Sequence, residues 1–135
     1  MLLTAAAAGA SGVILTKGCA DPYGSKVIRA SAGSLLRIAC VQDADGFTAA
    51  RFLKSFGINM AAAHLKGDVS PYRADMANAV CIMIGNEARG LSSELTALAD
   101  TLIRIPMDAG VESLNAAAAG SILLYEAVRQ RRRLP

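Results

Sequence analysis

At 135 residues the chain has the length of one domain, and 53% of its residues are hydrophobic although only 4% are aromatic. Such a core has to be built from Ala, Val, Ile, Leu and Met, which suits helices lying close against a sheet better than an all-β sandwich. The net charge is +3, but four of the 14 basic residues are Arg129, Arg131, Arg132 and Arg133. The rest of the chain is nearly neutral, so charge alone does not establish a nucleic-acid partner.

The polar composition excludes several other classes of protein. Cys19, Cys40 and Cys81 are widely spaced, and neither a C-x-x-C pair nor a histidine cluster accompanies them, so we expect no zinc site and no disulfide framework. Cys40 and Cys81 lie in apolar runs, as small buried hydrophobic residues do. A reducing, cytoplasmic location is therefore expected. No apolar run is long enough to cross a bilayer, and the apolar start lacks the charged region of a signal peptide.

The first half of the chain alternates between helical and strand patterns. Strands are predicted at 13–15 and 38–41, and helices at 2–8, 25–36 and 45–56. The last of these helices is amphipathic, and Phe47, Phe52 and Phe56 are available for its buried side.

The second half continues the alternation. Strands are predicted at 58–63, 80–84 and 102–105, and helices at 92–99 and 113–132. This order predicts one α/β domain with a mostly parallel sheet and helices on both faces. Ligands of such sheets bind beyond the carboxyl ends of the strands, which indicates the loops after Ala63, at 85–90 and at 106–112. His64, the only histidine, has no carboxylate partner nearby in sequence, and we expect a structural role for it.

The segment 84–91 places a loop with two glycines directly after an apolar strand. Gly85 and Gly90 let backbone N–H groups approach a ligand closely, and Asn86, Glu87 and Arg89 add polar side chains. Neither the phosphate-loop pattern nor the Gly-x-Gly-x-x-Gly fingerprint is present. On its own the segment is equally compatible with a ligand site and with a solvated turn.

The segment 105–119 passes from a strand that ends at Pro106, through an irregular loop, into the last helix. Ser113 and Asn115 fall in the expected first turn of that helix, where backbone N–H groups lack partners. A plain helix cap explains Ser113 well and Asn115 less well, because four alanines follow it. The small side chains at 116–119 let other backbone segments approach this helix closely.

Together these segments resemble a known family. Ile84-Gly85-Asn86-Glu87-x-x-Gly90-Leu91, Ile105-Pro106-Met107 and Val111-Glu112-Ser113-Leu114-Asn115, followed by Leu124-Tyr125-Glu126, closely resemble the second and third motifs of SpoU-type (TrmH-like) RNA 2′-O-ribose methyltransferases, members of the SPOUT superfamily. The segment 26–33 resembles the stretch between that family's first two motifs. The resemblance covers nearly the whole chain, and two long motifs in the right order make it specific.

The resemblance implies a fold and a cofactor. The fold is an α/β sheet whose C-terminal segment forms a trefoil knot, an exception to the general rule of unknotted chains. The cofactor is S-adenosyl-L-methionine, held within the knot largely by backbone groups. The residues at matching cofactor-binding positions are Ala62, Gly85, Asn86, Glu87, Gly90, Ile105, Met107 and Leu114.

The reaction implied is methyl transfer to a ribose 2′-hydroxyl of ribosomal or transfer RNA. Asn115, Glu87 and Ser113 match positions that shape the family's active site. Lys26 and Arg29 match a region that faces RNA, and the plain alternative for both is a solvated helix face. The sulfonium is itself a good leaving group, so no metal is expected.

The family acts as dimers through the final helix. Here Leu114, Ala118, Ile122 and Tyr125 recur at helical spacing. Such a stripe is compatible with a dimer interface and equally with a core-facing side within one subunit.

One part of the family pattern is not found. The first motif is a strand ending in Asn-x-Gly, followed by a helix with a catalytic arginine, and Leu3 stands where that arginine is expected. We therefore expect residues 1–135 to form a single domain that lacks its first strand and first motif. Two alternatives stay open: a catalytically impaired knotted module that binds S-adenosylmethionine or RNA without turnover, and an unrelated nucleotide-binding α/β enzyme, against which the missing phosphate-loop patterns argue.

Overall fold

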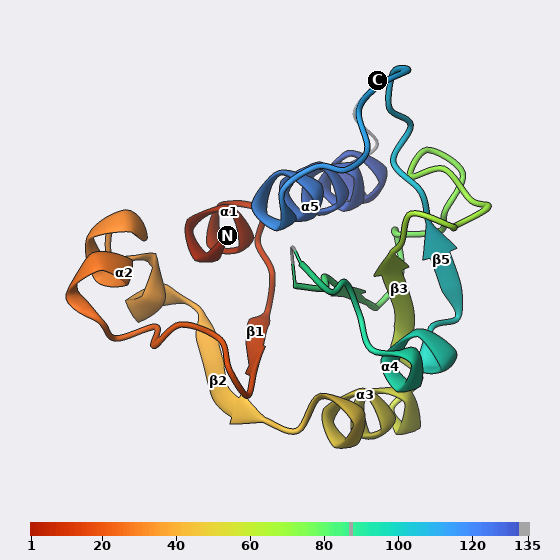
Figure 1. Cartoon of the computed structure of the whole chain (residues 1–135). Coiled ribbons are helices and arrows are strands. Elements are labelled where there is room, and N and C mark those ends of the chain that lie inside the picture. The colour runs from red at the N-terminus through yellow and green to blue at the C-terminus, as the bar shows by residue number, and fades with distance from the viewer. Residues whose placement is uncertain (87, 133–135) are drawn as a thin grey trace.

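A computed structural model describes residues 1–86 and 88–132 of the chain (Figure 1). In chain order the elements are α1 (Leu2–Ala7), β1 (Gly12–Thr16), α2 (Ser25–Ala30), the 3-10 helix η1 (Ser34–Arg37), β2 (Ala39–Ala44), α3 (Gly46–Ser55), β3 (Asn59–Ala63), β4 (Val80–Met83), α4 (Ser93–Leu98), β5 (Thr101–Ile103) and α5 (Ala116–Arg132). The predicted alternation of helices and strands is confirmed.

The strands form two parallel sheets. In the first, β3 lies between β4 and β5, and Ala62 is in register with Met83 on one side and Leu102 on the other. In the second, β1 pairs with β2, and Val13 is in register with Cys40. The predicted parallel α/β architecture is confirmed, but its strands are divided between two sheets, because within the described residues β1 and β4 share no hydrogen bonds.

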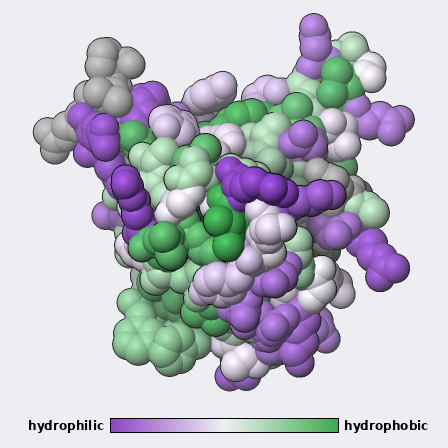
Figure 2. All heavy atoms as spheres, turned by 90° about the vertical axis from the view of Figure 1, so that its left-hand side faces the viewer, coloured by the Kyte–Doolittle hydropathy of each residue, from purple (hydrophilic) through white to green (hydrophobic). Residues whose placement is uncertain are grey.

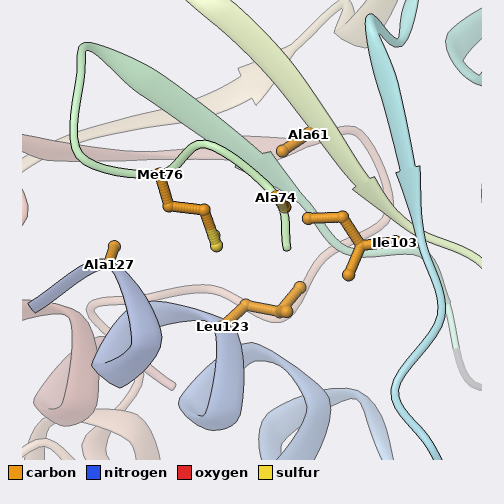
Figure 3. Close-up of a cluster of buried hydrophobic side chains, with 6 residues drawn as sticks. All are labelled: Ala61, Ala74, Met76, Ile103, Leu123 and Ala127. Carbon is orange, nitrogen blue, oxygen red and sulfur yellow. The ribbon is translucent and has the colours of Figure 1, made fainter. Parts of the chain in front are cut away.

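The three-stranded sheet is buried on both faces because its central strand carries small side chains. Met60, Ala61 and Ala62 are each at most 1% exposed. Ala61 faces α5 and packs in one cluster with Ala74, Met76, Ile103, Leu123 and Ala127, which converge from the helix, the sheet and the connection between β3 and β4 (Figure 3). Met60 and Ala62 face α3 and α4 in a second cluster. Helices therefore cover both faces, as the alternating pattern predicts.

Polar contacts fix α5 against the connection between β3 and β4. The Gln130 side chain donates a hydrogen bond to the Ala74 carbonyl oxygen (2.9 Å) and accepts one from the Met76 backbone N–H (2.8 Å). Gln130 also donates to the Glu126 carboxylate, which forms two further hydrogen bonds with Arg129. These contacts set how far along its axis the helix lies, which apolar packing alone does not determine.

The prediction that the phenylalanines lie on the buried side of α3 is wrong. Phe52 and Phe56 are 63% and 69% exposed and pack edge to face on the outside of the helix, with ring centroids 4.9 Å apart. Phe47 is also exposed. The sheet side of α3 carries Ala50 and Leu53 instead, which pack in the second cluster with Met60 and Ala62.

Two predicted helices have different bounds. The helix predicted at 25–36 ends at Ala30, and Gly33 adopts a left-handed conformation (φ 75°) before η1 begins. The last helix begins at Ala116, so Ser113 lies in the preceding loop and not in the first helical turn. Asn115 is the residue that caps this helix: its side-chain oxygen accepts a hydrogen bond from the Ala118 N–H (2.7 Å).

The structure also decides between the two interpretations of the helical stripe for its last two members. Ile122 and Tyr125 are 38% and 52% exposed, whereas Leu123 and Ala127 face the core. A core-facing role for Ile122 and Tyr125 is therefore wrong. Ala118 and Leu114 are half-buried.

The two-stranded sheet is less well covered than the other. Ile14 and Val41, which are partners in the register of β1 and β2, are 38% and 54% exposed. Figure 2 views the molecule from the side of α2 and β2 and shows apolar side chains in the middle of that face, with polar ones mainly around them. This part of the fold buries less apolar surface per residue than the three-stranded sheet.

Replacing Leu123 with alanine tests the importance of the buried cluster that Ala61, Ala74, Met76, Ile103, Leu123 and Ala127 form between α5 and the sheet, here called the α5 cluster. The side chain is fully buried between α5 and the sheet, so we expect Leu123→Ala to lower the free energy of unfolding by about 3 kcal/mol. Ile122→Ala, one residue away and partly exposed, is the matched control and should cost well under half as much. Urea unfolding of the two variants measures this, and equal losses would contradict the assigned helix orientation.

The Glu126 carboxylate makes stability depend on pH. The Arg129 guanidinium lowers the pKa of Glu126 below its ordinary value of 4.5, so the stabilisation is complete above pH 4.5 and is lost as the pH falls toward the lower pKa of the folded state. We expect Glu126→Gln to be less stable than the parent at pH 7 and the difference to shrink below pH 4.5. Thermal unfolding from pH 7 to pH 3 measures it, with the exposed Glu94→Gln as control. A difference that stays constant would disprove the pairing.

Candidate active site at the carboxyl ends of three strands

The carboxyl ends of the three-stranded sheet meet around one apolar cluster. Ala63, Ile84 and Ile105, which end β3 or follow β4 and β5, all pack against the cluster that contains Leu123. Neighbouring strands lie about 4.8 Å apart, so the turns after β4 and β5 start roughly 10 Å from each other. The two motif segments therefore leave the sheet at the same edge, with the α5 cluster beneath them.

The turn after β4 is closed by its own backbone. The Asn86 N–H donates to the Gly90 carbonyl oxygen (3.1 Å), and the Gly90 N–H donates back to the Asn86 carbonyl oxygen (2.7 Å). A β-carbon at Gly85 would overlap the backbone of Gly90 and Leu91, so only glycine fits there. Gly90 has φ 66°, a second position that favours glycine. Both glycines are therefore explained by the shape of the turn.

The polar and glycine residues of this turn differ in their hydrogen bonds and in their exposure. The Asn86 side-chain oxygen accepts a hydrogen bond from the Ala88 N–H (2.8 Å) and so braces the turn from within. Asn86 and Arg89 are exposed at its surface, and Gly85 is partly buried at its base. Glu87 lies outside the described residues.

The segment after β5 is an open loop that leads into the cap of α5. Met107 and Leu114 are half-buried, Ser113 is exposed, and Gly110 adopts φ 93° at the bend. The Asn115 backbone carbonyl oxygen accepts from the Ala119 N–H (3.0 Å) while its side-chain oxygen binds the Ala118 N–H. Asn115 is thus held by the helix start, and its side-chain nitrogen donates no hydrogen bond to any of the described residues.

The segment after β3 lies alongside β5 on the side away from β3. The His64 N–H still donates to the Ile103 carbonyl oxygen on the β3 side (2.9 Å). On the other side of β5, Val69 forms a parallel bridge with Ile103, and the Val69 carbonyl oxygen accepts from the Arg104 N–H (2.9 Å). A β-carbon at Gly67 would lie 2.6 Å from the Leu102 carbonyl oxygen, so the backbones touch here. The His64 Nδ1 atom accepts a hydrogen bond from the Lys66 N–H (3.1 Å), as expected of a structural histidine.

Not all of the predicted site residues come together. Ala62 is 0% exposed and lies beneath the edge, whereas Ala63 reaches it. Lys26 and Arg29 are exposed on α2, which lies on the other side of the molecule from β5 (Figure 1). Within one copy of the chain, the residues predicted to face RNA are therefore separated from the two motif turns.

The sequence analysis missed a polar cavity at the carboxyl ends of β1 and β2. It measures about 220 Å³, and its lining includes Thr16, Asp21, Gln42 and Asp43. Asp43 has φ 54°, an uncommon conformation for a residue other than glycine. The Asp21-Pro22 turn after a strand is the signal that could have indicated it.

The described residues contain no group of three or more His, Cys, Asp or Glu side chains placed to hold a metal ion. Nor do they contain a helix that is both long and apolar enough to span a membrane. The three cysteines are free, and burial raises the pKa of the Cys40 and Cys81 thiols, whereas Cys19 is exposed. Cys40 and Cys81 are half-buried, less than the sequence led us to expect.

Comparison with known proteins places this geometry in a family. The family model of the SpoU rRNA methylases matches residues 1–125. The chain belongs to the SpoU rRNA methylase family. The resemblance stated from the two motifs is thereby confirmed.

Three similar proteins illustrate the relationship. The 23S rRNA (uridine(2479)-2′-O)-methyltransferase of Streptomyces viridochromogenes is 35% identical over 97% of this chain and 47% of its own length. The crystal structure of the SpoU methyltransferase AviRb from the same organism superposes with a TM-score of 0.91 at 34% identity, covering 98% of this chain and 53% of that one. An rRNA methyltransferase from Sinorhizobium meliloti, solved with AdoMet bound, gives a TM-score of 0.89 at 38% identity, covering 99% and 50%.

The SpoU domain seen here is thus only part of what its relatives contain. The chain spans about half the length of the curated relatives it matches. The matched part includes both motif turns and α5.

Replacing Gly85 tests the closed turn. Because a β-carbon at this position meets backbone rather than a flexible side chain, Gly85→Ala should cost about 1–3 kcal/mol of stability or open the turn. Gly24→Ala, where the added carbon would lie 3.3 Å from the Asp21 carbonyl oxygen, is a milder control. Thermal unfolding and amide exchange of Asn86 and Gly90 report the two effects, and an unchanged turn in Gly85→Ala would refute the described geometry.

Proposed function

We propose that the chain carries the catalytic part of an S-adenosyl-L-methionine-dependent methyltransferase that acts on a ribose 2′-hydroxyl of ribosomal or transfer RNA. The observation that carries the proposal is the convergence of the two family motifs at one edge of the sheet, around the α5 cluster. Relatives that match nearly the whole chain are named 23S rRNA 2′-O-methyltransferases, and one similar structure contains bound AdoMet.

The proposed cofactor site uses mainly backbone groups. Gly85, Asn86 and Gly90 present the closed turn on one side, with Glu87 in the same segment, and Ile105, Met107 and Leu114 lie on the other side. Ala62 supports the site from beneath, next to Ala63. A ligand can approach the backbone of the turn closely at Gly90, where an added β-carbon would meet no other atom within 4 Å. When bound, S-adenosylmethionine supplies an activated methyl group on a sulfonium.

The residues around that methyl group have to orient the 2′-hydroxyl and help remove its proton. Asn115 suits the first task because the cap of α5 fixes its side-chain oxygen and leaves its nitrogen to donate a hydrogen bond. Ser113, exposed two residues earlier, and Glu87 are the other polar groups we assign to this site. No metal is required for an in-line displacement at a methyl group.

We further propose that the C-terminal segment forms the trefoil knot of the family. Support comes from the way α5 is tied to the connection between β3 and β4. Gln130 bonds to Ala74 and Met76, and Arg131 donates to the Asn78 carbonyl oxygen (2.9 Å). That same connection pairs with β5 through Val69, so one segment contacts both the last helix and the outer edge of β5.

The remaining proposals concern partners and location. Ile122 and Tyr125, exposed on α5 with Ala118 and Leu114 nearby in sequence, suit a homodimer interface. A second copy would also offer another set of Lys26 and Arg29 side chains for RNA binding, which one copy holds far from its own motif turns. Free cysteines and an RNA substrate both suit the cytoplasm.

Calorimetry and methyl transfer test the proposed function. We expect S-adenosylmethionine and S-adenosylhomocysteine to bind in the micromolar range, and ribosomal or transfer RNA to accept a radiolabelled methyl group at a ribose. Binding without transfer would support the alternative of a module without turnover. If neither compound binds, both readings of the site are wrong.

Asn115 offers a sharper test of the assigned chemistry. Asn115→Asp keeps an oxygen that can cap α5 but loses the donor, so we expect stability to be nearly unchanged and transfer to fall by roughly 100-fold. Asn115→Ala loses both and should also destabilise the protein by about 1 kcal/mol. Normal transfer by a stable Asn115→Asp variant would remove Asn115 from the active site.

A further inference from the structure

The aromatic side chains of this protein lie outside its core, and half of them lie on one helix. The chain contains three phenylalanines, three tyrosines and no tryptophan, and all six rings are between 38% and 69% exposed. Aromatic residues usually supply much of a buried core, because each ring covers a large apolar area. Here the three phenylalanines project from the side of α3 that faces away from the sheet. A group of exposed rings of this kind indicates a binding surface.

Two of these rings form the walls of a groove. The groove runs along α3, has a volume of about 320 Å³, and is lined by Phe47, Thr48, Arg51 and Phe52. Phe47 and Arg51 are one helical turn apart, and the Arg51 guanidinium carbon lies 5.9 Å from the centre of the Phe47 ring. The Phe56 ring packs edge to face against Phe52 and supports it. This aromatic groove therefore combines flat apolar rings with a cation stacked on one of them.

The charge of the aromatic groove is positive. Within the described residues Arg51 forms no ion pair, whereas Lys54, the other cation of α3, pairs with Asp100. The nearby carboxylates are not part of the groove. Asp45 accepts a hydrogen bond from the first turn of α3 as its cap, and Asp43 lines the separate cavity at the ends of β1 and β2. The groove thus offers a partner a guanidinium with free N–H donors, which suits a phosphate.

The start of the aromatic groove lies close to one of the two motif segments. Gly46, the first residue of α3, lies against α4, because a β-carbon on Gly46 would be 3.2 Å from a side-chain carbon of Leu95. Figure 1 shows α3 and α4 side by side on the same face of the sheet. Leu95 follows Leu91, the end of the segment 84–91, by four residues, which is about one helical turn. An extended ligand bound at the candidate site can therefore continue toward α3.

The exposed apolar area of α3 is too small for a stable protein interface. A phenylalanine ring buries about 150–250 Å² when it is fully covered, so three rings that are about half exposed offer roughly 350 Å². Each partner of a stable protein complex buries about 800 Å². A nucleobase needs only one flat ring to stack on. The size of the surface therefore favours a nucleic-acid strand over a second copy of the chain.

We propose that the aromatic groove binds an unpaired stretch of RNA that flanks the nucleotide whose ribose enters the candidate site. A base stacks on the phenylalanine rings of the groove, and Arg51 donates hydrogen bonds to a phosphate of the same strand. The inference takes its substrate from the proposed function and adds a contact outside the two motif segments. Stacking accepts every base, so the groove selects unpaired RNA and not a particular sequence.

Equilibrium binding to RNA tests the aromatic groove. The probes are a fluorescent, unstructured RNA oligonucleotide and the same strand annealed to its complement. We expect Phe52→Ala to weaken binding of the single strand by roughly tenfold and to leave binding of the duplex unchanged. Phe52→Tyr keeps the ring and should bind within about twofold of the parent. Arg51→Gln should lower the slope of log Kd against log salt concentration by about 0.7, the value for one phosphate contact on a single strand.

Two controls separate the groove from general effects. Tyr72→Ala removes another aromatic side chain, 68% exposed on the connection between β3 and β4, and should not change RNA binding. Phe52→Ala should retain the Tm of the parent and its affinity for S-adenosylmethionine. Equal binding of the single strand by Phe52→Ala and the parent would overturn the inference, and so would an equal loss for single strand and duplex. Because cofactor binding and methyl transfer are measured separately, the groove can fail while the proposed function stands.

Photo-cross-linking locates the contact directly. The oligonucleotide carries 5-iodouridine, which reacts on irradiation with aromatic rings that it touches, and mass spectrometry identifies the modified residue. We expect the adduct on Phe47 or Phe52. Adducts found only outside α3 would contradict the assignment. A dimer that dissociates in Phe52→Ala, detected by sedimentation while RNA binding is unchanged, would show that a second copy covers this face and would also overturn the inference.

Discussion

The fold depends on how little space the side chains of β3 occupy. Ala61 and Ala62 point to opposite faces of the central strand, and each is fully buried. Because a methyl group is all that separates the backbone from the helices, α5 can lie close on one face, and α3 and α4 on the other. Larger residues, Met60 and Ile103, fill the remaining volume. A bulkier residue at either alanine would push a helix away and with it a motif segment that the helix supports.

Small residues also determine the shape of the candidate site. Where β4 ends, Gly85 lets two backbone segments touch, and where β3 ends, Gly67 does the same against β5. Turns of this kind are determined by backbone contacts and hydrogen bonds, and so their outer surfaces are free to present N–H and C=O groups to a ligand. The shape of the site therefore depends on its glycines as much as on its few polar side chains. Among these polar side chains, Asn115 is the most firmly held.

The sequence predicts local structure well here and spatial arrangement less well. Every predicted strand and helix is present, because apolar runs and capping residues such as Asp45 and Ser92 are local signals. The orientation of α3 could not be predicted, since three phenylalanines are the most hydrophobic choice for its buried side, whereas Ala50 and Leu53 occupy that side in the structure. The sequence favoured Ser113 over Asn115 as the cap of the last helix, but Asn115 has that role because α5 begins at Ala116.

The spatial arrangement of the site could not be predicted from local sequence patterns either. The two motifs were recognisable as sequences, but their common position follows from β3 lying between β4 and β5, an order that no local pattern specifies. Likewise the division into two sheets cannot be seen in the apolar pattern of β4, which is that of a strand with neighbours on both sides.

Gln130 fixes the position of α5 relative to the sheet. The sequence indicates only an arginine-rich helix end there, and apolar packing between α5 and the sheet would tolerate small shifts of the helix along its axis. Gln130 removes that freedom, because its amide can satisfy the Ala74 oxygen and the Met76 N–H together in only one position. Since Glu126 and Arg129 in turn fix the side chain of Gln130, a partly buried polar network, and not additional apolar area, sets the position of the helix that Asn115 caps.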